Sequence, residues 1–135
     1  MIYLDSCILI YAVEDDGPRG AACRERIQAH GDGGFAISPL VVHEVLVSPL
    51  RSADQARIEA FTRLFSAMTM IDLDVATFVH AAELRAKVPG LKTPDALHIT
   101  AARLRECHSM WTNDRRLQAA SAGLAIDVIH DHPGN

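Results

Sequence analysis

Four acidic residues of the chain have the chemistry and the positions from which a metal-dependent site can be built. Asp5 and Asp114 each follow a short apolar run, IYL and SMWT. Asp95 lies in TPDALHITAA, and Glu44 lies in SPLVVHEVLVSPL. Carboxylates gathered in one pocket repel one another and stay ionised together only when cations compensate their charge. An all-oxygen ligand set favours Mg²⁺ or Mn²⁺ over zinc or copper, and such a centre binds phosphates and activates water.

Asp95 heads the apolar face of a predicted helix. Thr93 is expected at the N-cap and Pro94 at N1, which places Asp95 in the first turn, where a negative charge interacts favourably with the helix dipole. Capping is the ordinary explanation for such an aspartate. Ile99 and Ala102, however, lie four and seven residues further on, so Asp95 belongs to the inward side of the helix. A carboxylate facing a cleft is the functional alternative.

Glu44 also lies on an apolar helix face. Its helical neighbours are Leu40, Val41 and Val47, and no Lys or Arg lies within one helical turn to pair with it. A carboxylate in that position must be paired, protonated, bound to a metal or placed at the edge of a cleft. A solvated edge position stays open beside the functional interpretation.

The segments that carry these acids are predicted to form an α/β fold. Short apolar runs that suit buried strands alternate with patterns of helical period. This alternation predicts a parallel sheet covered by helices on both faces. The predicted strands are 2–4, 35–37, 68–73, 109–112 and 125–129, and the predicted helices are 6–14, 19–30, 39–48, 53–67, 75–87, 94–106 and 115–122.

The ends of the first and fourth strands are where function is expected. In an open parallel sheet, functional residues gather at the carboxyl ends of strands where the strand order reverses. Asp5 follows the first strand and Asp114 the fourth, so all four acids converge on one cleft if these two strands are neighbours. Taken singly, each aspartate is best interpreted as a cap or turn residue, and Ser6 is expected to cap the helix that follows Asp5.

The whole chain, residues 1–135, is predicted to be a single soluble domain in the cytoplasm. Apolar residues make up 49% of it, but no apolar run approaches the roughly 20 residues of a membrane span. The start MIYLDSCILIYAVEDD lacks a basic signal-peptide region, and three widely spaced cysteines form no zinc motif. Residues 130–135 are expected to form a flexible tail, in which His130 and His132 suit solvent better than a metal.

The net charge leaves the class of partner open. The chain carries 13 basic and 17 acidic residues, a net charge of −4. This argues mildly against binding nucleic acid by charge alone. Four acids held around bound cations would account for the whole excess of negative charge. The net charge therefore neither excludes nor supports binding to nucleic acid.

The chain resembles the PIN domain, in particular the small toxins of VapBC-type toxin–antitoxin pairs. The resemblance rests on IYLDS, the apolar helix with Glu44, TPDALH and WTNDRRL, in that order, and covers essentially the whole chain. It implies a three-layer α/β/α fold, with a parallel sheet of about five strands in the order 3-2-1-4-5 and about seven helices. It also implies Mg²⁺- or Mn²⁺-dependent endoribonuclease activity. By position, Asp5, Glu44, Asp95 and Asp114 take the catalytic and metal-binding roles.

The resemblance implies supporting residues around these acids. Ser6 and Thr112 match the hydroxyl positions beside the first and last acids, and Asn113 belongs to the same T-N-D motif. His98 follows Asp95 as in some members, where it either supports Asp95 from one turn away or is a plain surface histidine. The candidates for RNA-facing cations, each of which also suits a solvated helix face, are Arg51, Lys92, Arg115 and Arg116.

The resemblance also implies partners, since toxins of this type are dimers held inactive by a small antitoxin. An RNA substrate, a cognate antitoxin and a second copy of the chain are therefore expected, and a membrane is not. The helix at 39–47 is apolar nearly all round, with Val42, Val45 and Leu46 on faces away from Glu44. Such a helix needs cover on more than one face. Either a partner or the helix at 53–67 supplies it.

Two other functions compete with the nuclease. A receiver-like signalling domain needs a phosphoacceptor aspartate after the third strand, for which Asp72 or Asp74 is the candidate. It also needs a lysine near the last strand, which AIDVIHDHPGN lacks. An inactive PIN-like scaffold is the other alternative, and the complete set of four acids argues against it.

Overall fold

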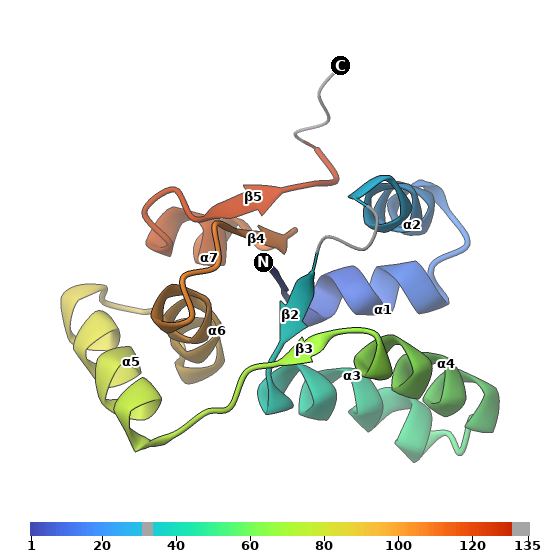
Figure 1. Ribbon diagram of the computed structural model, residues 1–135, viewed down its shortest axis with the longest axis horizontal. Helices are drawn as coiled ribbons and strands as arrows, with labels where there is room; N and C mark the ends of the chain where they lie inside the picture. Colours follow the sequence, from blue (N-terminus) through green and yellow to red (C-terminus); the bar gives the residue numbers. More distant parts are fainter. Residues whose placement is uncertain (31–33, 131–135) are drawn as a thin grey trace.

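A computed structural model describes residues 1–30 and 34–130 of the chain. Its centre is a five-stranded sheet in the order β3-β2-β1-β4-β5, in which all neighbouring strands are parallel (Figure 1). The predicted sheet order and α/β/α fold class are confirmed. The strands are β1 (Ile2–Leu4), β2 (Phe35–Ile37), β3 (Thr69–Met70), β4 (Ser109–Thr112) and β5 (Ala125–Asp127).

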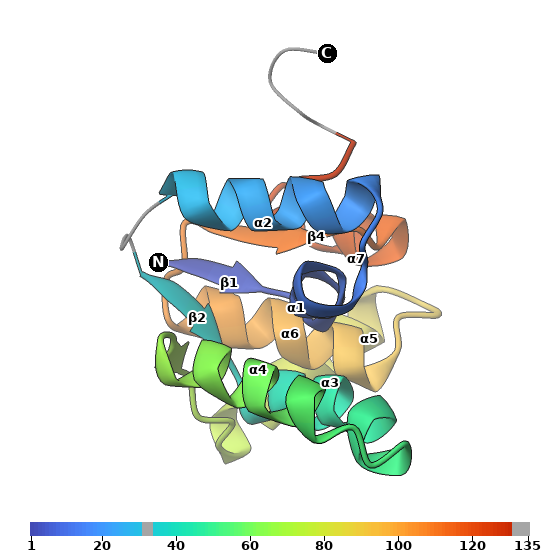
Figure 2. The ribbon, with the colours of Figure 1, turned by 90° about the vertical axis from the view of Figure 1, so that its right-hand side faces the viewer.

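Helices cover both faces of the sheet. Helices α1, α2 and α4 lie on one face, α6 and α7 lie on the other, and α5 packs outside α6 (Figures 1 and 2). Helix α3 lies beside α1 and α4. The bounds are α1 (Ser6–Glu14), α2 (Pro18–His30), α3 (Pro39–Arg51), α4 (Gln55–Ser66), α5 (Val75–Lys87), α6 (Thr93–Leu104) and α7 (Arg115–Ala120).

The central strands and α6 form the core. Tyr3, Leu4 and Met110 are fully buried, as expected for strands covered on both faces. Residues 96–102 of α6 are all buried, because α6 lies between the sheet and α5. Any polar side chain in this part of α6 must therefore find a partner inside the protein.

The third strand differs most from the prediction. The run at 68–73 is predicted as a buried strand, but only Thr69 and Met70 pair with β2, and both are exposed. β3 is the edge strand of the sheet, so one of its sides has no neighbouring strand. Ile71, which follows it, is buried and donates its backbone N–H to the Ile37 carbonyl at 2.7 Å.

Two helix ends also differ from the prediction. Helix α3 does not end at residue 48 but continues to Arg51, with Pro49 inside its last turn. The Ser52 hydroxyl donates to the Ser48 carbonyl there, at 3.2 Å. Helix α6 begins at Thr93, one residue before the predicted start, which makes Lys92 its N-cap. No side-chain hydrogen bond caps α6, so Asp95 is not a capping residue in the described structure.

Helix α3 receives its cover from inside the chain. Helix α4 packs against it, which is the second of the two predicted alternatives. Val45 is buried, and Val42 and Leu46 are half-buried. The apolar side chains that α3 still exposes are Val47, at 39%, and Leu50, at 60%.

None of the helices in the described ranges is both long enough and apolar enough to span a bilayer. The predicted tail lies almost wholly outside the described residues, and so does His132. His130 is described, in a turn after β5.

Candidate active site

The first and fourth strands are neighbours, which is the condition on which convergence of the acids depends. Leu4 pairs with Trp111, and the Asp5 backbone N–H donates to the Trp111 carbonyl at 3.0 Å. The strand order reverses at this pair, so Asp5 and the T-N-D motif after β4 begin at the same edge of the sheet.

Asp5 is buried, with 6% of its surface exposed, and its carboxylate serves both structure and site. Oδ1 accepts the Ser6 backbone N–H at 2.8 Å, so Asp5, and not Ser6 as predicted, is the N-cap of α1. Oδ2 accepts the Thr112 hydroxyl at 2.7 Å. Thr112 Oγ1 in turn accepts the Asp114 backbone N–H at 3.0 Å. Thr112 therefore fixes the first and last acids relative to each other.

Asp114 caps the short helix α7. Its Oδ1 accepts the backbone N–H groups of Arg116 at 2.9 Å and Leu117 at 3.3 Å. Its Oδ2 has no hydrogen-bond partner among the residues that the structure describes, so this oxygen is available to a ligand. The cap and the functional interpretations of Asp114 are compatible.

Asn113 is held by a residue that sequence reasoning did not single out. Its Nδ2 lies 3.3 Å from both carboxylate oxygens of Asp127, which is buried at the end of β5. Burial raises the pKa of Asp127, but hydrogen bonds from the His130 side chain and from backbone N–H groups outweigh it and lower the pKa below its usual value. His130 therefore belongs to this structural cluster.

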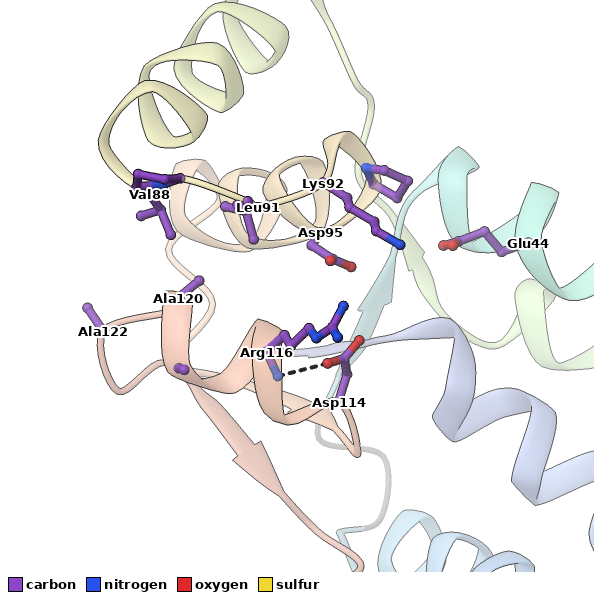
Figure 3. Close-up of a pocket in the computed structure, with 13 residues that line it drawn as sticks. Glu44, Val88, Leu91, Lys92, Asp95, Asp114, Arg116, Ala120 and Ala122 are labelled. Atoms are coloured by element: carbon purple, nitrogen blue, oxygen red, sulfur yellow. Dashed lines mark hydrogen bonds between the residues drawn. The ribbon is translucent and has the colours of Figure 1, made fainter.

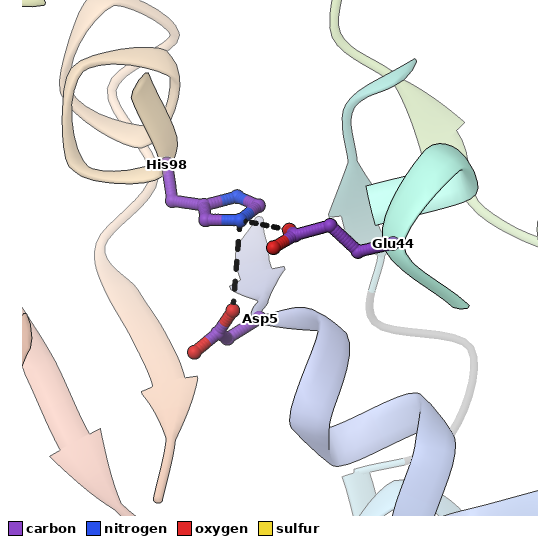
Figure 4. Close-up of side chains that lie close together, drawn as sticks. All are labelled: Asp5, Glu44 and His98. Carbon is purple, nitrogen blue, oxygen red and sulfur yellow. Dashed lines mark hydrogen bonds and ion pairs between the residues drawn. The ribbon is translucent and has the colours of Figure 1, made fainter. Parts of the chain in front are cut away.

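His98 is buried, not a surface residue, and it contacts Glu44 directly. Its Nε2 lies 2.5 Å from Glu44 Oε1 and 3.7 Å from Asp5 Oδ1 (Figure 4). Its Nδ1 lies 2.7 Å from the Tyr3 hydroxyl, which lies 2.8 Å from Ser38 Oγ. This chain of contacts joins β1, β2, α3 and α6 inside the protein.

The hydrogens of this chain can be assigned from the donors and acceptors present. An ionised Glu44 carboxylate only accepts, so the 2.5 Å contact requires a hydrogen on His98 Nε2. The Tyr3 hydroxyl can both donate and accept, so it pairs with His98 Nδ1 on one side and with Ser38 Oγ on the other. Although Asp5, Glu44 and His98 each offer an atom within 4.8 Å of the others, an Nε2 that carries hydrogen cannot bind a metal. In this arrangement His98 Nε2 is engaged by Glu44 Oε1, and the imidazole holds that carboxylate in position.

The four acids line one cavity of about 570 Å³, which we call the acidic pocket. Asp5 and Asp114 reach it from the strand ends, Glu44 from α3 and Asp95 from the first turn of α6. Desolvation by burial raises the pKa of Asp95, and the charges of Asp114, Asp5 and Glu44 raise it further, while His98 opposes them. Repulsion from the neighbouring acids therefore adds to desolvation in raising the pKa of Asp95.

The oxygens that remain free fit a hard cation. Asp95 has no side-chain hydrogen bond to any residue that the structure describes, and the same holds for Glu44 Oε2. Together with Asp114 Oδ2 they face a pocket already lined by Asp5. Partner-free carboxylate oxygens around one cavity are the ligand set that Mg²⁺ and Mn²⁺ prefer. The residues present therefore fit a divalent metal.

The four predicted cations lie in different places. Arg116 lines both the acidic pocket and a second cavity beside it. Of these two cavities, Arg115 lines the acidic pocket and Lys92 lines the second. Arg51, at the end of α3, is exposed and lines neither cavity.

Residues that sequence reasoning missed share one feature, a polar group inside an apolar run. Tyr3 reads as a core residue of IYL, and Ser38 as a helix cap only. Cys7 lines the acidic pocket, with its Sγ 3.6 Å from Asp5 Oδ2. A buried tyrosine hydroxyl needs a hydrogen-bond partner, which is the one signal available beforehand. It does not say which partner.

Asp95→Asn is expected to stabilise the metal-free protein at neutral pH. Folding raises the pKa of Asp95, so ionising this carboxyl is harder in the folded than in the unfolded protein. The group therefore destabilises the folded protein as pH rises past its pKa in the unfolded chain, and the full cost is reached above the raised pKa of the folded state. In EDTA at pH 7.5, the variant should melt a few degrees above wild type, whereas below about pH 3.9 the gain should vanish because the acid is protonated in both states. Asp16→Asn, at an exposed aspartate outside the pocket, is the control. A variant that melts below wild type at neutral pH would contradict the repulsion.

Comparison with known proteins gives the class to which this fold and site belong. Residues 2–123 match the PIN domain, and the chain belongs to the PIN domain family. It is similar to Ribonuclease VapC23 of Mycobacterium tuberculosis, with 27% identity over 124 residues that make up 89% of this chain and 98% of the relative. The predicted resemblance to VapC-type members of the family is confirmed.

Solved structures show the same fold. A toxin–antitoxin complex from Klebsiella pneumoniae contains a chain with a TM-score of 0.77 and 20% identity, over 95% of this chain and 98% of that one. VapC20 of Mycobacterium tuberculosis, described as a sarcin–ricin loop cleaving toxin, has a TM-score of 0.74 and 17% identity, over 89% and 95% of the two chains.

Proposed function

We propose that the protein is a Mg²⁺- or Mn²⁺-dependent endoribonuclease and the toxin of a type II toxin–antitoxin pair. The observation that carries the proposal is the acidic pocket, in which Asp5, Glu44, Asp95 and Asp114 meet at the reversal of strand order. The similarity to a ribonuclease over most of both chains supports the choice of RNA as substrate.

The four acids have separable tasks in this proposal. Bound Mg²⁺ or Mn²⁺ would polarise the scissile phosphate and lower the pKa of an attacking water. Asp5 and Asp114, fixed by Thr112, would hold the more tightly bound ion. Glu44 and Asp95 would complete the metal site or help to orient the water. Attack by water leaves 5′-phosphate and 3′-hydroxyl ends.

Metal dependence is tested with purified protein, a labelled unstructured RNA, and Mn²⁺ or EDTA. Cleavage is expected with Mn²⁺ and not with EDTA. Mn²⁺ should also raise the melting temperature, because a ligand at 100 times its Kd stabilises the native state by about 2.7 kcal/mol. Asp5→Asn combined with Asp114→Asn should remove this shift. Tight Mn²⁺ binding by the double variant would refute the assignment of the metal site.

The proposal includes partners and a cytoplasmic location, where RNA and a co-expressed antitoxin are present. The antitoxin would cover the apolar side chains that α3 exposes, Val47 and Leu50. A second copy of the chain would cover the apolar face of α5, where Val75, Phe78 and Val79 are exposed by 81%, 49% and 51%. Exposed apolar groups of this size on one helix are typical of contact surfaces.

The receiver-like alternative is disfavoured because both of its candidate phosphoacceptors, Asp72 and Asp74, follow the edge strand β3 and neither lines the acidic pocket. Asp74 is the N-cap of α5, and its Oδ1 accepts the Thr77 backbone N–H at 2.9 Å and the Thr77 hydroxyl at 2.8 Å. It follows the edge strand β3, two strands away from β1 and the acidic pocket.

A further inference from the structure

A second, larger cavity adjoins the acidic pocket. Its volume is about 890 Å³, and it shares Glu44, Asp95, Asp114 and Arg116 with the acidic pocket (Figure 3). Its remaining walls come from residues 88–92, between α5 and α6, and from α7 and the turn after it. We call this cavity the flanking groove. Because the acids form one of its ends, a ligand in the groove reaches the proposed metal site directly.

The two ends of the flanking groove differ in chemistry. At the end away from Glu44, Val88, Leu91 and Ala120 form apolar walls (Figure 3). Pro89, Pro94 and Ala119 add further apolar surface to the lining. Such a cavity suits a ligand with one flat apolar part and one charged part.

Two cations enter the groove between these ends. The Lys92 and Arg116 side chains project into it from opposite walls, beside Asp95 and Asp114 (Figure 3). Neither side chain forms an ion pair with a carboxylate among residues 1–30 and 34–130. Their donors are therefore available to an anionic ligand, and phosphate is a strong acceptor for such groups. They also offset the acids that would otherwise repel a polyanion.

The wall that carries Lys92 is held in place without a ligand. Arg85 of α5 donates from Nε to the Leu91 carbonyl at 2.8 Å and from Nη1 to Thr93 Oγ1 at 2.9 Å. Gly90 has a φ of 86°, which lets the chain turn sharply into α6. A wall that is already ordered costs little entropy when a ligand binds.

We propose that the flanking groove binds one unpaired nucleotide next to the scissile phosphate of an RNA strand. This inference rests on the proposed nuclease function. The base would contact the apolar walls, Lys92 and Arg116 would bind the adjoining phosphates, and the reacting phosphate would face the acids. A base stacked inside an A-form duplex cannot enter a cavity, so the groove selects single-stranded or looped RNA. Its volume is in the range of small-ligand sites, about 300–1,000 Å³.

Ala119→Glu tests the groove with little risk to the fold, because Ala119 is exposed on α7. Binding of a short fluorescent single-stranded RNA is measured by anisotropy with Mn²⁺, in a Glu44→Gln background that blocks cleavage. The groove variant should weaken binding at least about tenfold, or ~1.4 kcal/mol. Ala21→Glu, at an exposed alanine of α2, is the matched control and should change binding less than twofold.

Two further measurements identify the occupant. In the protein with an unaltered groove, RNA with an abasic site at one position next to the cut should bind less tightly than intact RNA. In Ala119→Glu, the two RNAs should bind with equal affinity. Lys92→Gln and Arg116→Gln should each reduce the slope of log affinity against log salt by about 0.7, the value for one phosphate of a single strand.

Several outcomes would overturn the proposal. The first is equal RNA affinity of Ala119→Glu and Ala21→Glu. The second is an RNA affinity that no abasic site next to the cut reduces. The third is an Ala119→Glu variant that binds a peptide partner less tightly but binds RNA normally. The last outcome would identify the groove as a peptide site. Failure of the nuclease proposal is distinguishable, since a wild-type protein that binds RNA through the groove but does not cut it with Mn²⁺ contradicts only the nuclease.

Discussion

Glu44→Gln is expected to reduce RNA cleavage by at least about a hundredfold, the loss typical of removing one group that stabilises transition-state charge. The substitution keeps an oxygen that can accept from His98 Nε2, the contact of 2.5 Å that holds the side chain. It removes the negative charge that faces the acidic pocket. Rates are measured on a labelled RNA with saturating Mn²⁺.

The stability of this variant separates a functional from a structural role. Because a charge is removed from a cluster of like charges, the metal-free melting temperature should stay the same or rise. A purely structural Glu44 predicts the reverse, a less stable protein with normal turnover. Glu59→Gln, at an exposed glutamate of α4, is the control for both measurements. Wild-type rates in a folded Glu44→Gln protein would exclude Glu44 from the active site.

His98→Leu is expected to weaken Mn²⁺ binding and cleavage by roughly 10–100-fold, the usual cost of losing a group that orients a metal ligand. Leucine fills much of the space of the imidazole but leaves Glu44 without its donor. His98→Gln should recover most of the loss, since the glutamine amide nitrogen can take the place of Nε2. Mn²⁺ affinity is measured by titration calorimetry without RNA. If His98 only filled space in the core, replacing it by glutamine rather than leucine would not restore this affinity.

The pair of variants also discriminates between orienting and metal-binding roles for His98. If His98 were itself a ligand through Nε2, His98→Gln would be as defective in Mn²⁺ affinity as His98→Leu. Tyr3→Phe provides a third test, because it removes the hydroxyl 2.7 Å from Nδ1 and leaves the contact with Glu44. Its effect on Mn²⁺ affinity should be smaller than that of His98→Leu. An effect as large would mean that the Tyr3 hydroxyl, rather than His98 alone, positions Glu44.

Much of the architecture could be read from the sequence because its signals are local. Continuous apolar runs predict strands buried on both faces, and helical patterns between them predict a parallel sheet with helices on both sides. Asp5 and Asp114 were identifiable because they follow such runs. The sheet order itself came from the resemblance to the PIN domain. The weakest prediction was β3, since pairing at a sheet edge depends on tertiary contacts and not on the apolar run alone.

The partners of individual side chains were decided only by the tertiary structure. Glu44 and His98 are 54 residues apart, and the sequence places neither near the other. Local helix geometry paired His98 with Asp95, one turn away, whereas packing of α6 against the sheet turns its imidazole toward Glu44 and Tyr3. The flanking groove likewise depends on how residues 88–92 pack beside α7. Side-chain periodicity determines which face of an element is buried, but the contacts across that face depend on how whole elements are placed in space.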